Sequence, residues 1–312
     1  MAEITAIRFH AYGPVDVLSA DRIEAPTPAP GEVAIDMKAA SVNPIDWKLR
    51  KGLLKDVFPA RFPVAVGRDG SGVIADVGEG VDPGRIGQRV AFMVGHDRGT
   101  FAERITLRAD LAVAILETLS FAEAAALPLA GLSAWSALAA APPIEPGMRV
   151  LIHAGAGGIG TLAIQLACLR GASVAATCSA RNADFVRNLG ASEVIAHDED
   201  RFEDRLTDLD LVFDTVGGEV HARSYGVLKK GGALVALNAA PFVEQSADYG
   251  VTLIRPTIAP DPAALTEILA LAGCGKLKPI IDRIYPFAEF RVAQGQSETG
   301  PVRGKIVVEI GT

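Results

Sequence analysis

The sequence predicts an α/β protein in which a doubly wound parallel sheet is joined to a second, mainly β, barrel-like domain. Three observations support this prediction. A chain of 312 residues is long for a single hydrophobic core, so two domains are expected. Residues 1–120 form short strand-like stretches separated by Gly and Pro, which is typical of a β-rich domain. From residue 121 onward, strand patterns alternate with helix patterns, which is typical of a parallel sheet covered on both faces.

The amino-terminal part is expected to hold short strands and one short helix. Residues 32–42 alternate apolar and polar side chains, as in a long half-buried strand. Residues 43–52 open on Asn-Pro and close on Gly, which predicts a capped helix with proline in its first turn. The other expected strands are residues 4–9, 73–77, 89–94, 101–106 and 111–113.

The middle of the chain is expected to alternate strands and helices. Residues 120–141 are rich in alanine and should form two helical segments that are split at Pro128. A strand that starts at Arg149 then leads through a glycine-rich turn into a helix. The remaining expected strands are residues 173–177, 194–196, 209–214, 233–237 and 251–258, with helices at 182–189, 220–228 and 261–272.

The glycine-rich turn lies in the stretch Arg149 to Gly171, which reads RVLIHAGAGGIGTLAIQLACLRG. Gly155, Gly157 and Gly160 stand in G-x-G-x-x-G register, and Gly158 adds a further flexible position. Such a turn lets the backbone approach a pyrophosphate, and the helix that follows directs N–H groups and its positive dipole end at the phosphates. Because the motif lies between a strand pattern and a helix pattern, it predicts a dinucleotide site rather than a bare turn.

The stretch after the second strand bears on the choice of dinucleotide. Sites that select NAD carry an Asp or Glu about 20 residues after the first glycine, where it binds the ribose hydroxyls. No acidic residue occurs between Gly155 and Asp184. Ser179, Arg181 and Asn182 stand there instead, and such side chains can bond a 2′-phosphate that a carboxylate would repel. We therefore expect NADP(H), with a solvated Arg181 as the alternative.

Composition excludes several classes of protein. The net charge of −7 and the lack of a basic cluster argue against a nucleic-acid partner. Cys168, Cys178 and Cys274 are scattered, which favours a reducing compartment over a disulfide framework or a metal cluster. The amino terminus lacks a signal pattern, and no apolar run reaches about 18 residues. We expect a cytoplasmic protein with no membrane partner.

Taken together, these segments resemble the medium-chain dehydrogenase/reductase superfamily, and within it the zinc-free quinone oxidoreductase (zeta-crystallin-like) branch. The matching segments run almost from end to end and include SVNPIDWKLRKG, PVAVGRDGSGVIADVGEGV, AALPLAGLSAWSAL, VLIHAGAGGIGTLAIQLA, LVFDTVGG, LKKGGALV and RGKIVVEI. The resemblance is specific to the family but not to a substrate. It implies a Rossmann cofactor domain over residues 121–274 and a discontinuous GroES-like catalytic domain over residues 1–120 and 275–312.

The resemblance also bears on metal binding. Zinc alcohol dehydrogenases of this superfamily use a Cys after the long strand, a G-H-E motif, and a later Cys or Asp. Asn43 and Gly67-Arg68-Asp69 stand at the first two of these places, and the four-cysteine structural lobe is missing. Zinc needs Cys, His or carboxylate ligands in a tetrahedral set, so no metal site is expected. The scattered histidines, His10, His96, His153, His197 and His221, are interpreted as surface or core residues.

Without a metal as Lewis acid, reduction of a quinone or conjugated enone is the less demanding chemistry, because charge delocalises as hydride arrives. By resemblance, Asn43 is the candidate donor to the substrate carbonyl or the nicotinamide ribose, and a helix-capping role is equally compatible. Ser133 stands where the family commonly has Thr beside the nicotinamide, so it is assigned to catalysis and cofactor binding. Asp46 is interpreted as an exposed carboxylate on a helix face, with the orientation of neighbouring groups as the alternative, and Asp69 as a brace of a turn.

The resemblance implies further cofactor contacts. His197 stands where some relatives use Tyr near the adenosine phosphate, and Lys305 is expected to face the phosphates, with solvated side chains as the alternatives. The full set of expected cofactor contacts is Ser133, Gly155, Ala156, Gly157, Gly158, Ile159, Gly160, Ser179, Arg181, Asn182, His197, Val216, Leu237, Asn238, Ala239 and Lys305.

These observations favour a zinc-independent, NADPH-dependent reductase of quinones or α,β-unsaturated carbonyl compounds. Two alternatives stay open, namely an enoyl-thioester reductase of the same superfamily and a non-catalytic NADPH-binding redox sensor or structural protein. The resemblance implies a homodimer formed through the sheet edge of the cofactor domain. The apolar edge segment of residues 251–258 is consistent with this, and an edge covered by its own chain is the alternative.

Overall fold

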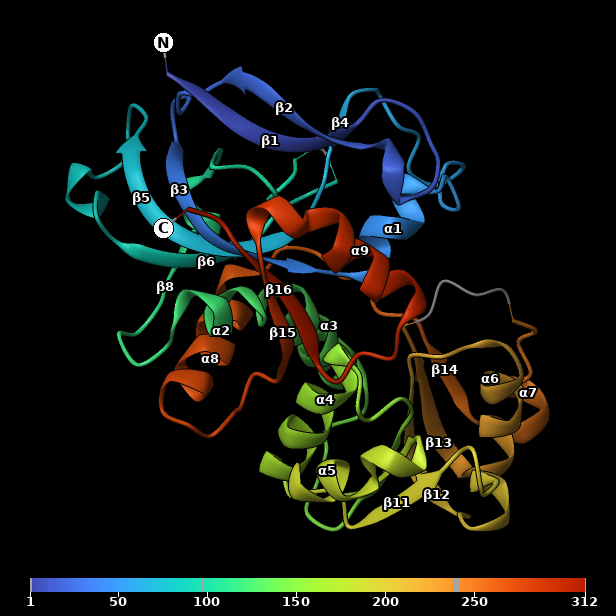
Figure 1. Cartoon of the computed structure of the whole chain (residues 1–312). Helices are drawn as coiled ribbons and strands as arrows, with labels where there is room; N and C mark the ends of the chain where they lie inside the picture. Colours follow the sequence, from blue (N-terminus) through green and yellow to red (C-terminus); the bar gives the residue numbers. More distant parts are fainter. Residues whose placement is uncertain (1, 97, 238–241, 312) are drawn as a thin grey trace. The chain divides into compact units, whose positions relative to one another are not determined.

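The computed structural model describes residues 2–96, 98–237 and 242–311. The chain divides into two compact units (Figure 1). The first unit comprises Met1–Leu129 and Ala259–Thr312, and the second comprises Ala130–Ile258. Helix α3 (Pro128–Ala140) carries the chain from the first unit into the second. The first unit is therefore discontinuous in sequence.

Two β-sheets form the framework of the first unit. The larger sheet has the strand order β15-β16-β3-β5-β6-β8, with β7 paired to β3, and the smaller sheet has the order β2-β1-β4. The larger sheet comprises β3 (Glu32–Val42), β5 (Asp69–Val77), β6 (Arg89–Met93), β7 (Arg104–Arg108), β8 (Val113–Ala114), β15 (Ile281–Pro286) and β16 (Lys305–Glu309). The smaller sheet comprises β1 (Glu3–Phe9), β2 (Leu18–Glu24) and β4 (Val64–Ala65).

The alternation in β3 places its apolar side chains in the core of the first unit. Val33, Ile35 and Met37 are buried there together with Phe92 and Leu107. Four helices of this unit are α1 (Pro44–Arg50), α2 (Phe121–Ala125), α8 (Pro262–Gly273) and α9 (Phe290–Thr299). The antiparallel pairing of β16 with β3 sets Ile306 opposite Val42, so strands that are far apart in the sequence are neighbours in this sheet.

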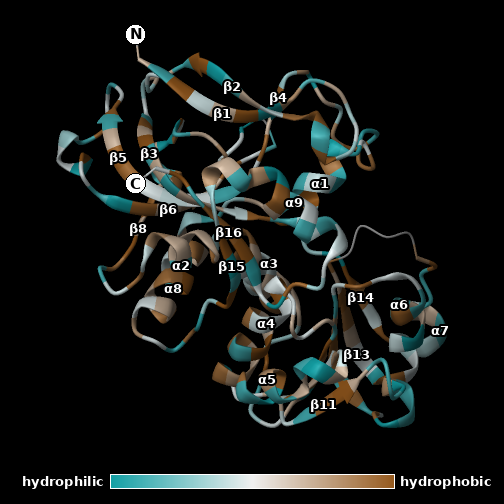
Figure 2. Cartoon of the chain, viewed as in Figure 1, coloured by the Kyte–Doolittle hydropathy of each residue, from teal (hydrophilic) through white to brown (hydrophobic). Residues whose placement is uncertain are grey.

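A six-stranded parallel sheet forms the second unit, in the order β11-β10-β9-β12-β13-β14. Its strands are β9 (Arg149–Ile152), β10 (Ser173–Cys178), β11 (Glu193–Ala196), β12 (Leu209–Asp214), β13 (Leu228–Ala236) and β14 (Thr252–Ile254). Its other helices are α4 (Gly158–Leu169), α5 (Ala183–Asn188), α6 (Gly218–Ser224) and α7 (Ser246–Tyr249). Figure 2 shows apolar residues along β11 and β13. The strand order reverses between β9 and β12, where ligands bind in sheets of this kind.

The predicted fold class is confirmed, including the helix break at Pro128 that separates α2 from α3. The expected edge strand over residues 251–258 is shorter, since β14 ends at Ile254 ahead of Pro256. Helices α2 and α8 both belong to the first unit, because α2 packs on β3 and β5 and α8 packs on β8. The domain boundaries at residues 120 and 275 stay a prediction. Within the described ranges, no helix has the length and apolar character that a bilayer crossing requires.

Candidate functional site

The glycine-rich turn connects β9 to α4 in the second unit. Ala154 adopts a φ of 52°, and the N–H of Gly155 donates to the carbonyl oxygen of Thr177 over 2.8 Å. A Cβ at position 160 would lie 2.2 Å from the carbonyl oxygen of Ala154 and 2.9 Å from the Cα of Gly155. Real Cβ atoms do not come so close to backbone, so the closure of this turn requires glycine at position 160.

The first turn of α4 offers hydrogen-bond donors to a ligand. Gly157 is the N-cap residue, and no side chain caps the helix. Among the described residues, nothing accepts the N–H groups of Gly158, Ile159 and Gly160. Open N–H groups at the positive end of a helix dipole form a site for an anion. The turn therefore fits the pyrophosphate of a dinucleotide, with Ala156 buried beneath it.

The residues expected near a 2′-phosphate follow β10. Ser179 precedes a short 3₁₀ helix that contains Arg181 and Asn182. The hydroxyl of Ser179 lies 3.5 Å from Nε2 of His197, which follows β11. The structure thus brings side chains from two neighbouring strand ends to one place.

Asp198 lies in the same place and was missed by the sequence reasoning. Its carboxylate accepts a hydrogen bond of 2.8 Å from the N–H of Ala180. That hydrogen bond, together with the charges of His197 and Arg181, holds the pKa of Asp198 below its ordinary value. Because β10 and β11 are parallel neighbours, residues after both strands meet at one sheet edge, and this signal identifies Asp198.

Asp214 fixes the loop that follows β12. Its Oδ1 accepts the N–H of Val216 over 2.8 Å, and its carbonyl oxygen accepts the N–H of Leu237 over 2.8 Å. The other carboxylate oxygen lies 2.8 Å from Nδ1 of His221, and both side chains are fully buried. Asp214 therefore holds both of the expected cofactor contacts Val216 and Leu237 through hydrogen bonds to their backbone N–H groups.

Three expected site residues need separate comment. Ser133 is buried in α3. Asn238 and Ala239 lie outside the described residues.

Asn43 is the centre of a buried cluster in the first unit. Its Nδ2 donates to Oδ1 of Asp69 over 2.8 Å and makes longer contacts of 3.2 and 3.3 Å with the carbonyl and hydroxyl oxygens of Ser41. Its Oδ1 accepts a hydrogen bond from Nζ of Lys305. The carboxamide oxygen thus faces an ammonium group and the amide nitrogen faces a carboxylate. Both orientation and position of Asn43 are fixed by these charges.

Lys305 enters the cluster from β16. Its Nζ also donates to the carbonyl oxygen of Val42 over 3.0 Å, and the third N–H has no acceptor among the described residues. Burial lowers the pKa of the ammonium, while the charges of Asp69 and Asp46 oppose this shift. The structure places the ammonium beside Asn43, and its expected contact with the phosphates stays a prediction.

Asp69 braces the cluster with both carboxylate oxygens. Oδ1 accepts a hydrogen bond of 2.6 Å from the hydroxyl of Ser41, and Oδ2 accepts the N–H of Leu129 over 2.9 Å. Its carbonyl oxygen accepts the hydroxyl of Thr100 over 3.0 Å. This carboxylate therefore links β5 to β3 and to the start of α3, which is a wider role than bracing one turn.

The interpretation of Asp46 as an exposed carboxylate is wrong. The residue is 4% exposed, because the capping box at the start of α1 holds its carboxylate against the backbone N–H of Asn43. Oδ2 accepts the N–H of Asn43 over 2.8 Å, whereas Oδ1 has no partner among the described residues. Burial raises the pKa of Asp46 to about 7, against the opposing effect of the Asn43 N–H. The charge of Asp69 adds to this rise, and that of Lys305 opposes it.

The raised pKa of Asp46 makes stability depend on pH. A carboxyl whose pKa is higher in the folded state stabilises the fold below its unfolded pKa, and this stabilisation is lost as pH rises toward 7. We expect Asp46→Asn to gain stability relative to the wild type between about pH 4 and pH 7, by about 1.4 kcal/mol per pH unit at most. Urea unfolding across this range measures the difference, with the exposed Asp56→Asn as control. If the free energy of unfolding changes with pH in the same way in the wild type and in Asp46→Asn, the burial of a charged Asp46 is contradicted.

No group of three or more His, Cys, Asp or Glu side chains that could hold a metal ion occurs in the part of the chain that the structure describes. The positions that correspond to zinc ligands in relatives hold Asn43, Arg68 and Asp69. Arg68 is buried, and its Nη1 lies 2.8 Å from Nε2 of His96. A guanidinium cannot ligate a cation, so these residues do not form the tetrahedral donor set of zinc.

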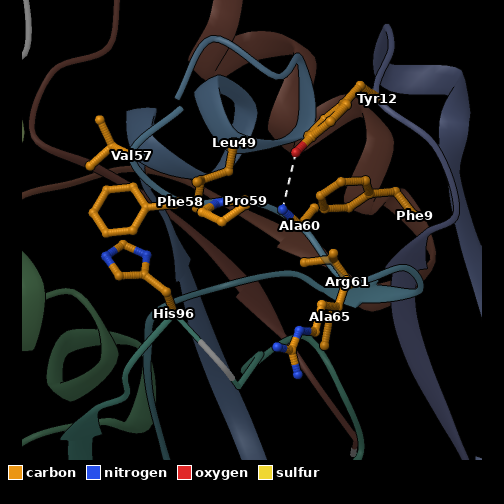
Figure 3. Close-up of a pocket in the computed structure, with 11 residues that line it drawn as sticks. Phe9, Tyr12, Leu49, Val57, Phe58, Pro59, Ala60, Arg61, Ala65 and His96 are labelled. Carbon is orange, nitrogen blue, oxygen red and sulfur yellow. Dashed lines mark hydrogen bonds between the residues drawn. The ribbon is translucent and has the colours of Figure 1, made fainter. Parts of the chain in front are cut away.

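The first unit also contains a cavity of about 490 Å³ (Figure 3). Its wall is formed largely by apolar side chains, namely Phe9, Tyr12, Leu49, Val57, Phe58 and Val64. His96 also lines it, with its ring 3.8 Å from that of Phe58 between centres. Figure 3 shows the hydroxyl oxygen of Tyr12 accepting the N–H of Ala60, over 3.1 Å.

Comparisons with known families and proteins agree with this geometry. Residues 29–117 match the alcohol dehydrogenase GroES-like domain, and residues 189–308 match the zinc-binding dehydrogenase family. The 2-methylene-furan-3-one reductase of Solanum lycopersicum is 34% identical over 321 residues, which cover 98% of this chain and 79% of that protein.

Two solved structures are similar over the full length. The quinone oxidoreductase from Coxiella burnetii is 35% identical, with a TM-score of 0.91 and coverage of 99% of this chain and 100% of that one. The Escherichia coli quinone oxidoreductase complexed with NADPH is 28% identical, with a TM-score of 0.88 and coverage of 98% of this chain and 99% of that one. The similarity therefore includes both units.

Proposed function

The chain belongs to the quinone oxidoreductase branch of the medium-chain dehydrogenase/reductase superfamily, and from this we propose that it is a zinc-independent, NADPH-dependent reductase of quinones or α,β-unsaturated ketones and aldehydes. The proposed cofactor domain, residues 121–274, is built around the parallel sheet of the second unit, and residues 1–120 and 275–312 form the proposed catalytic domain. The observation that best supports this proposal is the buried array of Lys305, Asn43 and Asp69. It supplies fixed hydrogen-bond donors without a metal ion.

Residues of the second unit are proposed to hold the cofactor. The open N–H groups at the start of α4 bind its pyrophosphate, and Val216 and Leu237 border the nicotinamide half. Ser133 contacts the nicotinamide, and Asn238 and Ala239 are further proposed contacts of the cofactor. When bound, NADPH supplies a hydride. The E. coli relative was crystallised with NADPH, which supports this choice.

Residues of the first unit are proposed to stabilise the negative charge that develops on the acceptor oxygen. The ammonium of Lys305 has one N–H left for this purpose, and Asn43 reaches an acceptor by exchanging its long contacts with Ser41. The ammonium is held by Val42 and Asn43, so this donor is in position before the charge appears, whereas the carboxamide exchanges only its contacts with Ser41. The reaction is balanced when the acceptor takes up one hydride from the cofactor and one proton from solvent.

The decisive experiment is NADPH consumption with a panel of quinones and enones. Turnover of either class supports the proposal. Binding of NADPH with no turnover of any acceptor favours a non-catalytic NADPH-binding protein, whereas turnover of enoyl thioesters alone favours the enoyl-thioester reductase. The tomato relative reduces, by its name, a methylene-furanone, which favours enones among the candidate acceptors.

We expect Arg181→Ala to raise the KM for NADPH about tenfold and to leave the KM for NADH within twofold. The guanidinium is exposed beside Ser179 and Asn182, where a charge-assisted hydrogen bond to the 2′-phosphate is worth about a factor of ten. Steady-state kinetics with both coenzymes test this. The control is Arg187→Ala, which removes an exposed arginine that pairs with Asp184. An equal change for both coenzymes would contradict a phosphate contact.

We also propose that the protein is a cytoplasmic homodimer without a nucleic-acid partner. Strand β14 lies at the end of the sheet order in the second unit, and such an edge favours a partner strand. Sedimentation velocity at several concentrations tests the dimer. A monomer at all of them would refute it.

A further inference from the structure

A buried histidine lies at the end of β9, directly before the glycine-rich turn. His153 is fully buried, and residues 150–152 of the strand before it are all apolar. An imidazole in such a place costs free energy unless its nitrogens have partners. Both have one, since Nδ1 lies 3.0 Å from the hydroxyl oxygen of Thr177 and Nε2 lies 3.0 Å from that of Ser224. The ring therefore joins β10 to α6 beneath the turn.

The hydrogen bonds of the two hydroxyl groups determine which ring nitrogen carries the proton. The hydroxyl of Ser224 donates its single hydrogen to the carbonyl oxygen of Val220 over 2.6 Å, so it can only accept from His153. Nε2 is therefore the N–H donor, and Nδ1 of the neutral ring is left as an acceptor. The hydroxyl of Thr177 donates to Nδ1 in turn.

The surroundings of the ring keep it neutral. Burial lowers the pKa of His153 to about 4. The charges of Asp214 and Glu203 oppose this shift in pKa, and those of Arg223 and His221 add to it. At neutral pH the imidazole is therefore uncharged, as an acceptor at Nδ1 requires.

Thr177 connects the ring to the turn that is proposed to hold the pyrophosphate. Its hydroxyl oxygen accepts the N–H of Ala154 over 3.3 Å, and its carbonyl oxygen accepts that of Gly155 over 2.8 Å. Ala154 has a φ of 52°, a left-handed conformation that a residue with a Cβ keeps only where its neighbours hold it. The carbonyl oxygen of Ala154 accepts the N–H of Gly157, the N-cap of α4, so the conformation of Ala154 helps to set where that helix starts.

We propose that His153 is a positioning residue of the coenzyme site, which through Thr177 holds Ala154 in the conformation that directs the start of α4 at the pyrophosphate of NADPH. The inference rests on the coenzyme site proposed above and adds to it a fully buried residue. The hydrogen bonds all run in one direction, from the N–H of Ala154 to the carbonyl oxygen of Val220, so each strengthens the next. Helix α6 thereby anchors the turn.

Two substitutions of His153 separate this role from a merely structural one. In His153→Asn the amide oxygen takes the place of Nδ1 and still accepts from Thr177. In His153→Gln the amide nitrogen takes the place of Nε2, where it donates to Ser224 and leaves the hydroxyl of Thr177 without its acceptor. Both lose the edge-on contact of the ring with Phe202, so both should lower the Tm alike.

The two variants should differ in their affinity for NADPH. His153→Gln should raise the Kd about tenfold, which corresponds to the loss of one buried hydrogen bond, whereas His153→Asn should stay within about threefold of the wild type. Titration of nicotinamide fluorescence measures the Kd, and thermal unfolding measures the Tm.

Thr177→Val tests the same link with His153 in place. It removes the hydroxyl but keeps the shape of the side chain and the carbonyl oxygen that binds Gly155, and it should also raise the Kd about tenfold. His153→Gln combined with Thr177→Val should bind NADPH about as weakly as either variant alone, because both break one link. The control is Thr252→Val, which removes a hydroxyl from the edge strand β14 and should leave the Kd unchanged.

Nitrogen-15 NMR of histidine-labelled protein checks the direction of the hydrogen bonds. The signal of His153, assigned from its shift in Thr177→Val, should show a neutral ring protonated at Nε2 at pH 7. Equal Kd values for His153→Asn and His153→Gln overturn the proposal, as does an unchanged Kd in Thr177→Val or a proton at Nδ1. If neither His153 variant folds, Thr177→Val and the NMR signal decide. A wild type that binds no NADPH refutes the coenzyme site itself.

Discussion

Gly160→Ala is expected to weaken NADPH binding by about 10- to 100-fold, because the added Cβ cannot fit in the turn that holds the pyrophosphate. The Cβ would lie 2.2 Å from the carbonyl oxygen of Ala154 and 2.9 Å from the Cα of Gly155. All the atoms in the way are backbone, so the turn must open. Overpacking of this kind costs about 1–3 kcal/mol, which corresponds to that loss of affinity.

Two other glycines of the second unit allow the effect of Gly160→Ala on affinity to be compared with that of less crowded substitutions. A Cβ at Gly157 would meet the same carbonyl oxygen at 3.3 Å, so Gly157→Ala should weaken binding much less than Gly160→Ala. Gly226 has open space around it, and Gly226→Ala is the control in the same unit. Titration of nicotinamide fluorescence measures the affinities, and circular dichroism verifies the fold. Equal affinities for the variants at positions 160 and 157 would contradict the tight closure of the turn.

Lys305→Met is expected to lower kcat for the best acceptor by about 100-fold or more, with a smaller effect on the KM for NADPH. Loss of a fixed donor to a developing oxyanion has an effect of about 10²- to 10³-fold on kcat. The substitution also frees the carboxamide of Asn43, which keeps only its contacts with Asp69 and Ser41.

A purely structural role of Lys305 predicts a different outcome. Removing a buried ammonium from a cluster that contains Asp69 and Asp46 destabilises the fold, so thermal unfolding is measured beside the kinetics. Lys305→Arg keeps the charge but changes the donor geometry, and it should recover stability more than kcat. Asn43→Ser separates the two roles further, because it leaves Lys305 in place. Normal kcat in a folded Lys305→Met would eliminate the proposed role.

Local pattern was enough to predict much of the fold. The glycine spacing after β9 predicted the turn, and Asn43-Pro44 predicted the start of α1, since both features depend on neighbours along the chain. The break at Pro128 was predicted for the same reason. Strand β2 was not predicted. Its place in the sheet depends on its pairing with β1, and the sequence of β2 alone does not indicate that pairing.

Contacts between distant residues explain what the sequence did not reveal about the candidate site. The burial of Asp46 depends on what packs against α1, and a short helix with mixed residues does not indicate its buried face. Lys305 was expected at the site only because of a family motif. Its hydrogen bond with Asn43 joins residues that are 262 positions apart in the sequence, so no local pattern could predict it. The contact of Arg68 with His96 is likewise a product of the tertiary fold.

The pairing of the last strand with β3 has a consequence for how the protein matures in the cell. Asn43 is synthesised 262 positions ahead of Lys305, and the second unit is synthesised between them. The intervening second unit has its own continuous sheet and can form while translation proceeds. The array proposed to stabilise charge on the acceptor is thus completed after the second unit, so a chain that ends before Lys305 is expected to bind coenzyme without reducing an acceptor.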